Sequence, residues 1–323
     1  YLTCTSHRYK EVRHMTDETY DVIIVGGGPA GFTAGIYAGR SGLKSMVMEK
    51  AMTGGQMSTS YLIENWPGDA EISGQDLTVK MKDHTSRYTE IKEFSEVVDI
   101  IKEDTFLVKT TEDEIRSKSL IIATGAEHKK LGVPGDERFN GKGVSYCATC
   151  DGFFFKGKKV YVVGGGNTAL EYAIYLNSVG CDVTVIHRRD QFRAEEQLQK
   201  QFEEAGLDKL MGFIVESMNG DEALESLTIK DVGTGELKEI TTDGVFIAIG
   251  EEPNNEVPNL LDLALDEDGY VKVDQRRATS VPGVYAAGDV TGGLKQIVVA
   301  AADGAIAATS AFEDLRSPYW IKS

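Results

Sequence analysis

The chain has 323 residues, of which 41% are hydrophobic and 26% are charged, so its composition excludes a disordered chain and its length predicts two domains. Its 51 acidic and 34 basic residues give a net charge of -17, which argues against nucleic-acid and membrane-surface partners, although solubility alone would also account for the charge. No apolar run is long enough to span a bilayer, and four cysteines are too few for a disulfide scaffold, so we expect a cytoplasmic protein.

The first 14 residues lack both the apolar periodicity of a folded element and the apolar core of a signal peptide. Met15 follows them, and the chain then leads directly into an apolar run. We therefore interpret residues 1–14 as an N-terminal extension and expect it to be disordered.

The apolar run Tyr20–Val25 predicts a buried parallel strand that ends in a glycine-rich turn. A helix is predicted next, with Gly42 as its stop. Residues 44–48 then predict a second strand, which ends in Glu49. This order of strand, helix and strand is the start of a βαβ unit.

Gly26, Gly28 and Gly31 have the spacing of a dinucleotide-binding turn, in which backbone N–H groups approach a pyrophosphate at the helix N-terminus. The alternative for such a pattern is an ordinary glycine-rich loop. However, Glu49 lies 21 residues beyond Gly28, where a carboxylate accepts hydrogen bonds from ribose hydroxyls. We therefore predict that a dinucleotide binds at this first turn.

Two later parts of the chain share a second pattern. Residues 94–110 and 114–123 alternate or run apolar, which predicts a small antiparallel sheet that leads into a strand and a glycine. Residues 227–230 and 236–249 repeat this arrangement. The first dinucleotide-binding unit therefore closes with a strand and a glycine, and a later part of the chain ends in the same way.

Cys147 and Cys150, followed by Asp151, lie between these parts. A zinc ion would need further ligands, and Cys4 and Cys181 are isolated, so we predict no metal site. Two buried structural cysteines are another alternative. Two thiols three residues apart on one helical turn can form a disulfide, and Asp151 can give or take the proton that thiol exchange requires. The sequence therefore predicts a redox centre.

A second strand, helix and strand are predicted over residues 159–186. Gly164, Gly166 and Ala169 repeat the spacing of the first turn, with alanine at the last position. The residue 21 positions past Gly166 is His187 rather than an acid. The second turn therefore differs from the first in the part that contacts the ribose.

Arg188, Arg189 and Arg193 follow this histidine. An acid at the strand end would repel a 2′-phosphate, whereas guanidinium groups bind it through paired hydrogen bonds. The alternative is a solvated basic start of a helix. Because a cluster of cations is not expected in a chain of net charge -17, we predict NADP rather than NAD at the second turn.

Val284–Ala287 predicts a further strand, which we expect to lie beside the first strand of the same sheet. Gly288 and Asp289 end this strand, and an aspartate there can reach the ribityl hydroxyls of a flavin. The alanine-rich stretch from about residue 296 to residue 315 predicts a helix. Its positive N-terminal end would point at the flavin pyrimidine ring.

These motifs closely resemble those of the low-molecular-weight thioredoxin reductases, from about residue 18 to residue 315. The most specific are CATCD at 147–151 and the HRR motif at 187–189 with its later arginine. The other matching stretches are GGGPAG at 26–31, GGQ at 54–56, ENWPG at 64–68, ATG at 123–125, VGGGNTA at 163–169, AIG at 248–250 and SVPGVYAAGDV at 280–290. The chain departs from the family at Lys295, where many relatives have arginine.

The resemblance implies FAD at the first turn, NADPH at the second, a homodimer, and thioredoxin or a thioredoxin-like small redox protein as the partner. It also implies that Cys150 faces the flavin, that Cys147 attacks the thioredoxin disulfide, and that Asp151 is the acid–base residue. The residues it assigns to FAD are Gly26, Gly28, Pro29, Ala30, Gly31, Glu49, Gly55, Gln56, Asn65, Thr124, Gly125, Gly288, Asp289, Lys295, Gln296 and Ile297. Those it assigns to NADPH are Gly164, Gly166, Asn167, Thr168, Ala169, His187, Arg188, Arg189 and Arg193.

The predicted fold is α/β, with two Rossmann-like dinucleotide-binding domains of three layers (ββα). We expect a discontinuous FAD-binding domain over residues 15–126 and 252–323. The NADPH-binding domain, residues 127–251, is inserted into it and contains the CxxC motif. Because the cysteines and the flavin belong to different domains, we also predict a rigid-body rotation about the two chain crossings.

The predicted function is the NADPH-dependent reduction of thioredoxin through FAD and a Cys147–Cys150 disulfide, which is exchanged through a mixed disulfide. One alternative is a reductase of the same fold with another electron donor or protein acceptor, and the arginine cluster argues against another donor. A second is a redox sensor that binds FAD and NADPH without turnover, against which the intact CATCD motif argues. A zinc-binding structural protein is a more distant alternative.

Overall fold

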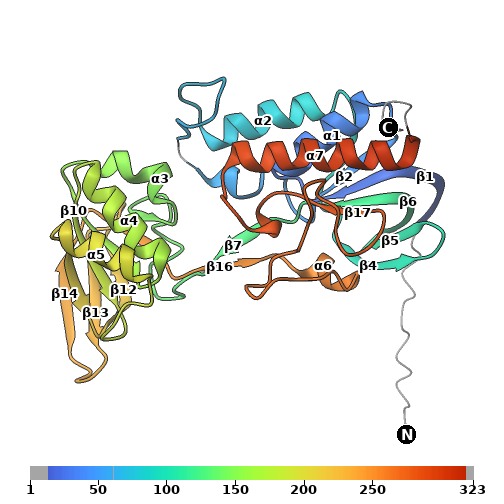
Figure 1. Cartoon of the computed structure of the whole chain (residues 1–323). Helices are drawn as coiled ribbons and strands as arrows, with labels where there is room; N and C mark the ends of the chain where they lie inside the picture. Colours follow the sequence, from blue (N-terminus) through green and yellow to red (C-terminus); the bar gives the residue numbers. More distant parts are fainter. Residues whose placement is uncertain (1–13, 61, 318–323) are drawn as a thin grey trace, which may run out of the picture. The chain divides into compact units, whose positions relative to one another are not determined.

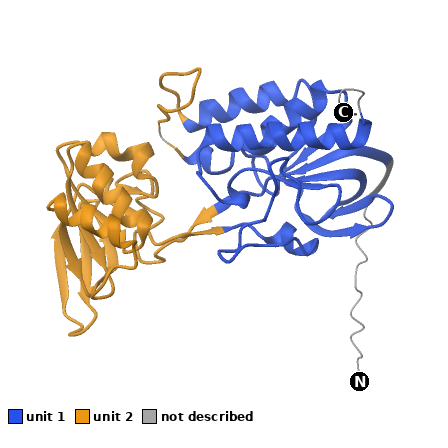
Figure 2. Ribbon diagram, viewed as in Figure 1, with its two compact units in different colours: residues 1–59, 74–126, 253–323 blue, residues 60–73, 127–252 orange. Residues whose placement is uncertain are grey.

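The computed structural model describes residues 14–60 and 62–317, and the chain forms two compact units (Figure 2). The first unit comprises residues 1–59, 74–126 and 253–323, and the second comprises residues 60–73 and 127–252. The N-terminal extension was expected over residues 1–14, of which residues 1–13 lie outside the described residues. The expectation is wrong at His14, which is the first residue of β1 and pairs with Asp113.

The first unit is built on a seven-stranded sheet with the order β3-β2-β1-β6-β5-β4, in which β17 also pairs with β6 (Figure 1). The pairs that β1, β2, β3, β6 and β17 form with one another are parallel, whereas β5 pairs antiparallel with both β4 and β6. The strands are β1 (His14–Val25), β2 (Ser45–Met48), β3 (Glu90–Lys92), β4 (Val97–Lys102), β5 (Phe106–Thr110), β6 (Asp113–Ile122) and β17 (Val284–Ala286). The predicted strands and the small antiparallel sheet are confirmed.

The position of β17 corrects one prediction. This strand pairs with β6 and not with β1, because β2 and β6 already pair with the two edges of β1. The C-terminal ends of β1, β6 and β17 nevertheless lie at the same edge of the sheet, since all three strands run in parallel. In parallel α/β sheets this edge is where ligands bind.

The two faces of the first sheet are covered differently. Along β1, Val22 and Ile24 pack with alanines of α1 and α7, while Ile23 and Val25 pack with the antiparallel strands and with residues after β16. Gly304 lets α7 approach α1, because a Cβ there would lie 2.1 Å from the backbone oxygen of Ala30. The helical segments are α1 (Pro29–Arg40), η1 (Gly55–Thr59), α2 (Gly74–Thr85), α6 (Glu256–Leu260), η3 (Asp289–Thr291) and α7 (Ile297–Arg316). Within the described residues, no helix combines the length and apolarity needed to cross a membrane.

The second unit contains a five-stranded parallel sheet, β11-β10-β9-β15-β8, and a three-stranded antiparallel sheet, β12-β13-β14. One face of the parallel sheet packs against helices and the other against the antiparallel sheet, so the predicted three layers are confirmed. Its strands are β8 (Val144–Ser145), β9 (Lys159–Gly164), β10 (Asp182–His187), β11 (Asp208–Met211), β12 (Phe213–Asn219), β13 (Ser226–Asp231), β14 (Leu237–Thr241) and β15 (Gly244–Ala248). Its helical segments are α3 (Ala148–Asp151), η2 (Gly152–Phe155), α4 (Asn167–Ser178) and α5 (Glu196–Glu204).

The chain crosses between the units at β7 (Ala126–His128) and β16 (Glu251–Pro253), which pair as a two-stranded sheet. These crossings lie where the sequence places the domain boundaries. The segment 60–73, which the sequence assigns to the first domain, groups with the second unit. It is a loop closed by an antiparallel bridge between Ile63 and Ile72. The rotation about the crossings stays a prediction.

Candidate active site

The first glycine turn joins β1 to α1, and the chain itself requires two of its glycines. Gly26 has a φ of +117°, and a Cβ there would lie 2.1 Å from the backbone oxygen of Ala123. A Cβ on Gly31 would lie 1.8 Å from the backbone oxygen of Gly26. Gly28 differs, because its φ of -85° suits any residue and a Cβ there would meet no protein atom within 4 Å. The open space at Gly28 fits the close approach of a bound pyrophosphate.

Glu49 and the loop after it lie against this turn. The Glu49 carboxylate accepts hydrogen bonds from the backbone N–H of Gly27 at 2.8 Å and from that of Ala51 at 3.1 Å. The N–H of Gly54 donates to the Gly27 oxygen at 2.8 Å, which brings Gly55 and the predicted Gln56 next to the turn. A carboxylate has about four acceptor sites, so Glu49 keeps capacity for ribose hydroxyls.

Glu93, which follows β3, holds the same loop, although the sequence analysis did not identify it. Its Oε1 accepts from the backbone N–H of Thr53 at 2.9 Å and from the Thr53 hydroxyl at 2.7 Å, and its Oε2 accepts from Lys82 at 2.7 Å. The hydrogen bond from Lys82 is the largest cause that lowers the pKa of Glu93 to about 2. No motif surrounds Glu93, so no signal in the sequence could have identified it.

We expect Glu93→Gln to lower the free energy of unfolding at neutral pH by about 1–2 kcal/mol, allowing for solvent screening. The folded pKa of about 2 lies below the ordinary value of 4.5, so the carboxylate stabilises the fold fully above pH 4.5. This contribution is lost as the pH falls from 4.5 towards 2. Urea unfolding at a series of pH values measures the difference between variant and parent. A difference that stays constant down to acid pH, or an equal loss in the exposed Glu96→Gln control, would contradict the assignment.

The predicted pair Thr124 and Gly125 is tied to Asn254, which directly follows β16 and which the sequence analysis also missed. The Thr124 hydroxyl donates to the Asn254 oxygen at 2.8 Å, and the Asn254 amide donates to the Thr124 oxygen at 2.8 Å. The Asn254 N–H donates to the Gly125 oxygen at 3.0 Å. These three bonds fix the backbone that follows β6.

Gly288 and Asp289 follow β17, and a buried ion pair supports them. Gly288 has a φ of +77°, and its N–H donates to the Asp303 carboxylate at 3.3 Å. Asp303 lies buried on α7 and pairs with Arg277. Burial raises the pKa of Asp303, while the charge of Arg277 opposes that rise. The sequence analysis identified the glycine and Asp289 but not the Arg277–Asp303 pair.

The N-terminus of α7 completes the first site. Gln296 is the N-cap residue and Ile297 the first helical residue, and the first turn of α7 contains no acid. The Lys295 ammonium lies 4.8 Å from the centre of the Tyr270 ring. The predicted FAD residues therefore follow strand ends or begin helices of the first unit, with the exception of Asn65. That residue belongs to the segment 60–73 of the second unit, so its contact with FAD stays a prediction.

The second glycine turn, between β9 and α4, repeats the geometry of the first. A Cβ on Gly164 would lie 2.2 Å from the Ala248 oxygen, and one on Gly165 would lie 2.3 Å from the His187 ring. Gly166, with a φ of -98°, is again open, and a Cβ there would meet nothing within 4 Å. The predicted residues 167–169 directly follow Gly166 and form the first turn of α4.

His187 is buried at the end of β10 and its ring packs under the second turn. Burial is the largest cause that lowers the pKa of His187, a hydrogen bond to the Gln191 oxygen opposes it, and the charges of the three nearby arginines add to the lowering. Arg188, Arg189 and Arg193 are exposed, and no carboxylate in the described part of the chain pairs with them. The three guanidiniums are therefore available to an anionic ligand.

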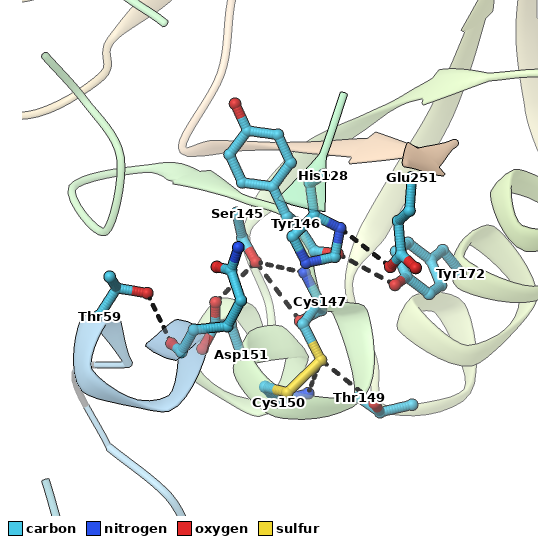
Figure 3. Close-up of a disulfide and its surroundings, with 11 residues drawn as sticks. Thr59, His128, Ser145, Tyr146, Cys147, Thr149, Cys150, Asp151, Tyr172 and Glu251 are labelled. Carbon is cyan, nitrogen blue, oxygen red and sulfur yellow. Dashed lines mark hydrogen bonds and ion pairs between the residues drawn. A yellow bond between two sulfur atoms is a disulfide. The ribbon is translucent and has the colours of Figure 1, made fainter. Parts of the chain in front are cut away.

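The two central cysteines form the predicted disulfide, Cys147–Cys150 (Figure 3). Cys147 is the N-cap residue of α3, and its sulfur accepts a hydrogen bond from the backbone N–H of Cys150 at 3.2 Å. The Thr149 hydroxyl lies 3.4 Å from the same sulfur. The other described cysteine, Cys181, is buried and free. Across the described residues, no three His, Cys, Asp or Glu side chains form a group that could hold a metal ion.

Asp151 ends α3, and burial raises the pKa of its carboxyl group. The Ser145 hydroxyl donates to Oδ2 of Asp151 at 2.6 Å, and this hydrogen bond opposes the rise. A carboxyl group with a raised pKa is suited to give and take protons. The sequence analysis identified Asp151 but not Ser145.

Tyr146, directly before the first cysteine, connects the redox motif to the crossings of the same unit. His128 of β7 stacks on its ring with the centres 5.2 Å apart, and the His128 Nδ1 lies 3.0 Å from Oε1 of Glu251 in β16. The Tyr146 hydroxyl donates to Asp136 at 2.7 Å. Only the tertiary structure brings these side chains together, because they come from four separate segments.

Comparisons with known proteins agree with this geometry. Residues 20–304 match the family model described as pyridine nucleotide-disulphide oxidoreductase. A thioredoxin reductase of Bacillus subtilis (strain 168) is 41% identical over 298 residues, which cover 91% of this chain and 94% of the relative. A thioredoxin reductase of Coxiella burnetii is 41% identical over 305 residues, which cover 90% of this chain and 95% of the relative. The crystal structure of thioredoxin reductase from Streptococcus pyogenes MGAS5005 is similar with a TM-score of 0.87 and 39% identity, covering 94% of this chain and 100% of that one.

Proposed function

This chain belongs to the pyridine nucleotide-disulphide oxidoreductases and, within them, to the thioredoxin reductases, and on this premise we propose that it uses NADPH and FAD to reduce thioredoxin or a thioredoxin-like small redox protein. It is a flavoprotein disulfide oxidoreductase that binds a flavin and a nicotinamide nucleotide. The observation that supports the finer proposal most is the Cys147–Cys150 disulfide, which lies in the same unit as a dinucleotide-binding turn.

FAD is proposed for the first unit. The open space at Gly28 leaves room for a pyrophosphate at the N-terminus of α1, and Glu49 supplies acceptors for the ribose. Asp289 after β17 and the N-terminus of α7 suit the ribityl chain and the pyrimidine ring. These four features come from one unit and fit a flavin dinucleotide.

NADPH is proposed for the second unit. Gly166 leaves the same open space as Gly28, and α4 begins directly after it. His187 replaces the acid that contacts an unphosphorylated ribose, and the exposed Arg188, Arg189 and Arg193 supply positive charge. Guanidinium groups suit the geometry and charge of a 2′-phosphate.

The chain's own residues would then act on the disulfide as follows. When bound, the two nucleotides supply the two electrons that open the Cys147–Cys150 disulfide. The Cys147 thiolate attacks the thioredoxin disulfide, forms a mixed disulfide and releases one thioredoxin sulfur as a thiolate. Asp151 takes the proton of the Cys150 thiol, and the Cys150 sulfur attacks Cys147. The bond between Cys147 and thioredoxin breaks, the second thioredoxin sulfur leaves with the electron pair, and protons from Asp151 and solvent neutralise the two thiolates.

An anaerobic titration of the purified yellow protein with NADPH and with NADH tests this proposal. We expect NADPH to bleach the flavin absorbance, to reduce one disulfide as well, and to support catalytic reduction of added thioredoxin. Bleaching without turnover would instead identify a redox sensor, and equal use of NADH would identify a reductase with another donor preference.

The oligomeric state is proposed on the resemblance, the location on the low cysteine count, and the absence of nucleic-acid or membrane partners on the net charge of -17. We propose a homodimer in the cytoplasm, with no nucleic-acid or membrane partner. Light scattering of the holoenzyme should give twice the chain mass of 35.2 kDa. A monomeric mass at micromolar concentration would overturn the dimer.

The two open glycines give a paired prediction. We expect Gly28→Ala to change the free energy of unfolding of the apoprotein by less than about 1 kcal/mol, because the new Cβ meets no protein atom. The same Cβ should lower FAD affinity at least about tenfold by overlapping the pyrophosphate. Gly166→Ala should instead lower NADP affinity and leave FAD binding unchanged. Calorimetric titration measures both affinities, and FAD binding by Gly28→Ala equal to that of the parent would contradict the placement.

A further inference from the structure

Ser145 lies at the centre of a small hydrogen-bonded cluster beside the disulfide (Figure 3). Its hydroxyl donates to Oδ2 of Asp151 at 2.6 Å and accepts from the backbone N–H of Cys147 at 3.1 Å. The backbone oxygen of Cys147 lies 3.4 Å from the same hydroxyl. One side chain therefore contacts the carboxyl group and both backbone polar groups of the first cysteine.

The fold fixes the position of this serine. Ser145 is the last residue of β8, is 5% exposed, and pairs in the parallel sheet with Phe246 of β15. Asp151 lies at the other end of the turn and is the last residue of α3. The serine is thus anchored to the sheet, and the hydrogen bond connects the sheet to the short helix that contains the disulfide.

A hydroxyl has one proton, so its contacts depend on the charge of Asp151. When Asp151 is ionised, the short bond at 2.6 Å is a charge-assisted donation from Ser145. When Asp151 is protonated, its own O–H can donate to Ser145, and the serine proton is then free for the Cys147 oxygen at 3.4 Å. The protonation of Asp151 therefore changes a hydrogen bond to the backbone of the first cysteine.

The other titratable side chains near this turn make no described hydrogen bond to Asp151 that could replace the one from Ser145. Burial raises the pKa of Asp151, Ser145 is the side chain that lowers it, and no charged group in the described part of the chain contributes to the shift. The titratable groups that pack near this turn from α4 and the following loop are Tyr172, Tyr175 and Cys181. Tyr172 donates to the Tyr146 oxygen, and Cys181 points to the Gly152 oxygen, so neither hydrogen bond is directed at Asp151.

We infer that Ser145 is a positioning residue for the acid–base step: its hydroxyl holds the Asp151 carboxyl group and the backbone of Cys147 in one arrangement. This inference rests on the proposed function, which assigns proton transfer to Asp151. Ser145 itself does not touch the reacting sulfurs in this role. It orients the carboxylate, favours its ionised form, and keeps the first cysteine in register with it.

Ser145→Ala in the holoenzyme tests the inference through the pH dependence of thioredoxin reduction. Removing a hydrogen bond to a charged carboxylate should raise the pKa of Asp151, so the limb in which activity appears as Asp151 ionises should move about 1–2 pH units to higher pH. The KM for thioredoxin should stay within about twofold, because Ser145 is buried and kcat alone reports the proton step. Difference infrared spectroscopy of the carboxyl C=O stretch measures the same pKa without turnover.

Two further variants serve as controls for this test. Ser145→Thr retains the hydroxyl and should restore the parent pH profile. Ser226→Ala removes another buried serine of this unit, which donates to the Glu239 carboxylate at 2.7 Å, and should leave the profile unchanged. An equal shift in Ser226→Ala, or no shift in Ser145→Ala, would overturn the inference.

A double-mutant cycle separates this inference from the proposed function. If Ser145 acts through Asp151, Ser145→Ala should have no further effect in the Asp151→Asn background. Additive losses would overturn the inference while leaving the acid–base role of Asp151 intact. A parent-like pH profile in Asp151→Asn would overturn the proposed role of Asp151 itself, and the inference with it.

Discussion

Replacing Cys147 with serine is expected to lower NADPH-dependent thioredoxin reduction by on the order of 10³-fold or more, the scale on which enzymes lose activity without their nucleophile. Cys150→Ser should cause an equally large loss, because the disulfide that accepts the electrons can no longer form. A steady-state assay with thioredoxin and a disulfide dye measures both losses. The two variants should nevertheless differ in their spectra.

The absorption spectrum distinguishes the roles of the two cysteines. In Cys147→Ser, Cys150 is no longer held in the disulfide and should give a thiolate–flavin charge-transfer band, whereas Cys150→Ser should not. Cys181→Ser is the matched control, because Cys181 is buried, free and outside the disulfide. It should keep the parent turnover. A charge-transfer band in Cys150→Ser alone would reverse the assigned roles, and full turnover by either active-site variant would exclude the disulfide from the reaction.

Replacing Arg189 and Arg193 with glutamine is expected to lower kcat/KM for NADPH by about 10²–10⁴-fold, since each charge-assisted hydrogen bond contributes roughly 1.5–3 kcal/mol. The kcat/KM for NADH should change by less than about threefold, because NADH has no 2′-phosphate to lose a contact. Initial rates with the two donors measure the ratio directly. The variant should also elute from a 2′,5′-ADP matrix at lower salt than the parent, because it has lost its contacts to the 2′-phosphate.

A control for net charge is available in the same unit. Arg138 and Lys142 are exposed and lie outside the second glycine turn, so replacing both with glutamine removes the same charge. This control should keep the preference for NADPH. An equal loss with both donors in the Arg189 and Arg193 variant would show that these arginines act structurally. A loss of preference in the control would assign the effect to long-range charge.

Local sequence was enough to predict the two glycine turns and the redox motif. Each turn is defined by residues within six positions of one another, at the point where an apolar run ends and a helix begins, so the chain neighbourhood alone determines the backbone path. The structure separates their roles: Gly26 and Gly31 are required by contacts within the chain, while Gly28 is not. The disulfide was likewise predictable, because Cys147 and Cys150 lie on one turn.

Contacts between distant segments could not be predicted in this way. Glu93 holds Thr53 across 40 residues, and Asn254 binds Thr124 across 130, with no motif at either end to indicate the partner. The expected place of β17 beside β1 was wrong for the same reason, because pairing depends on which strand edges remain open once the sheet has formed.

Ser145 shows the limit of prediction from local sequence. It is only six residues from Asp151, yet the direction of its hydroxyl depends on the pairing of β8 with β15, which lies about 100 residues further along the chain. Sequence by itself therefore determined the chemistry of this protein, because nucleotide turns and paired thiols are local patterns. Only the tertiary structure decided which side chains orient and support that chemistry, because hydrogen bonds join whatever groups the packed sheets and helices bring within reach.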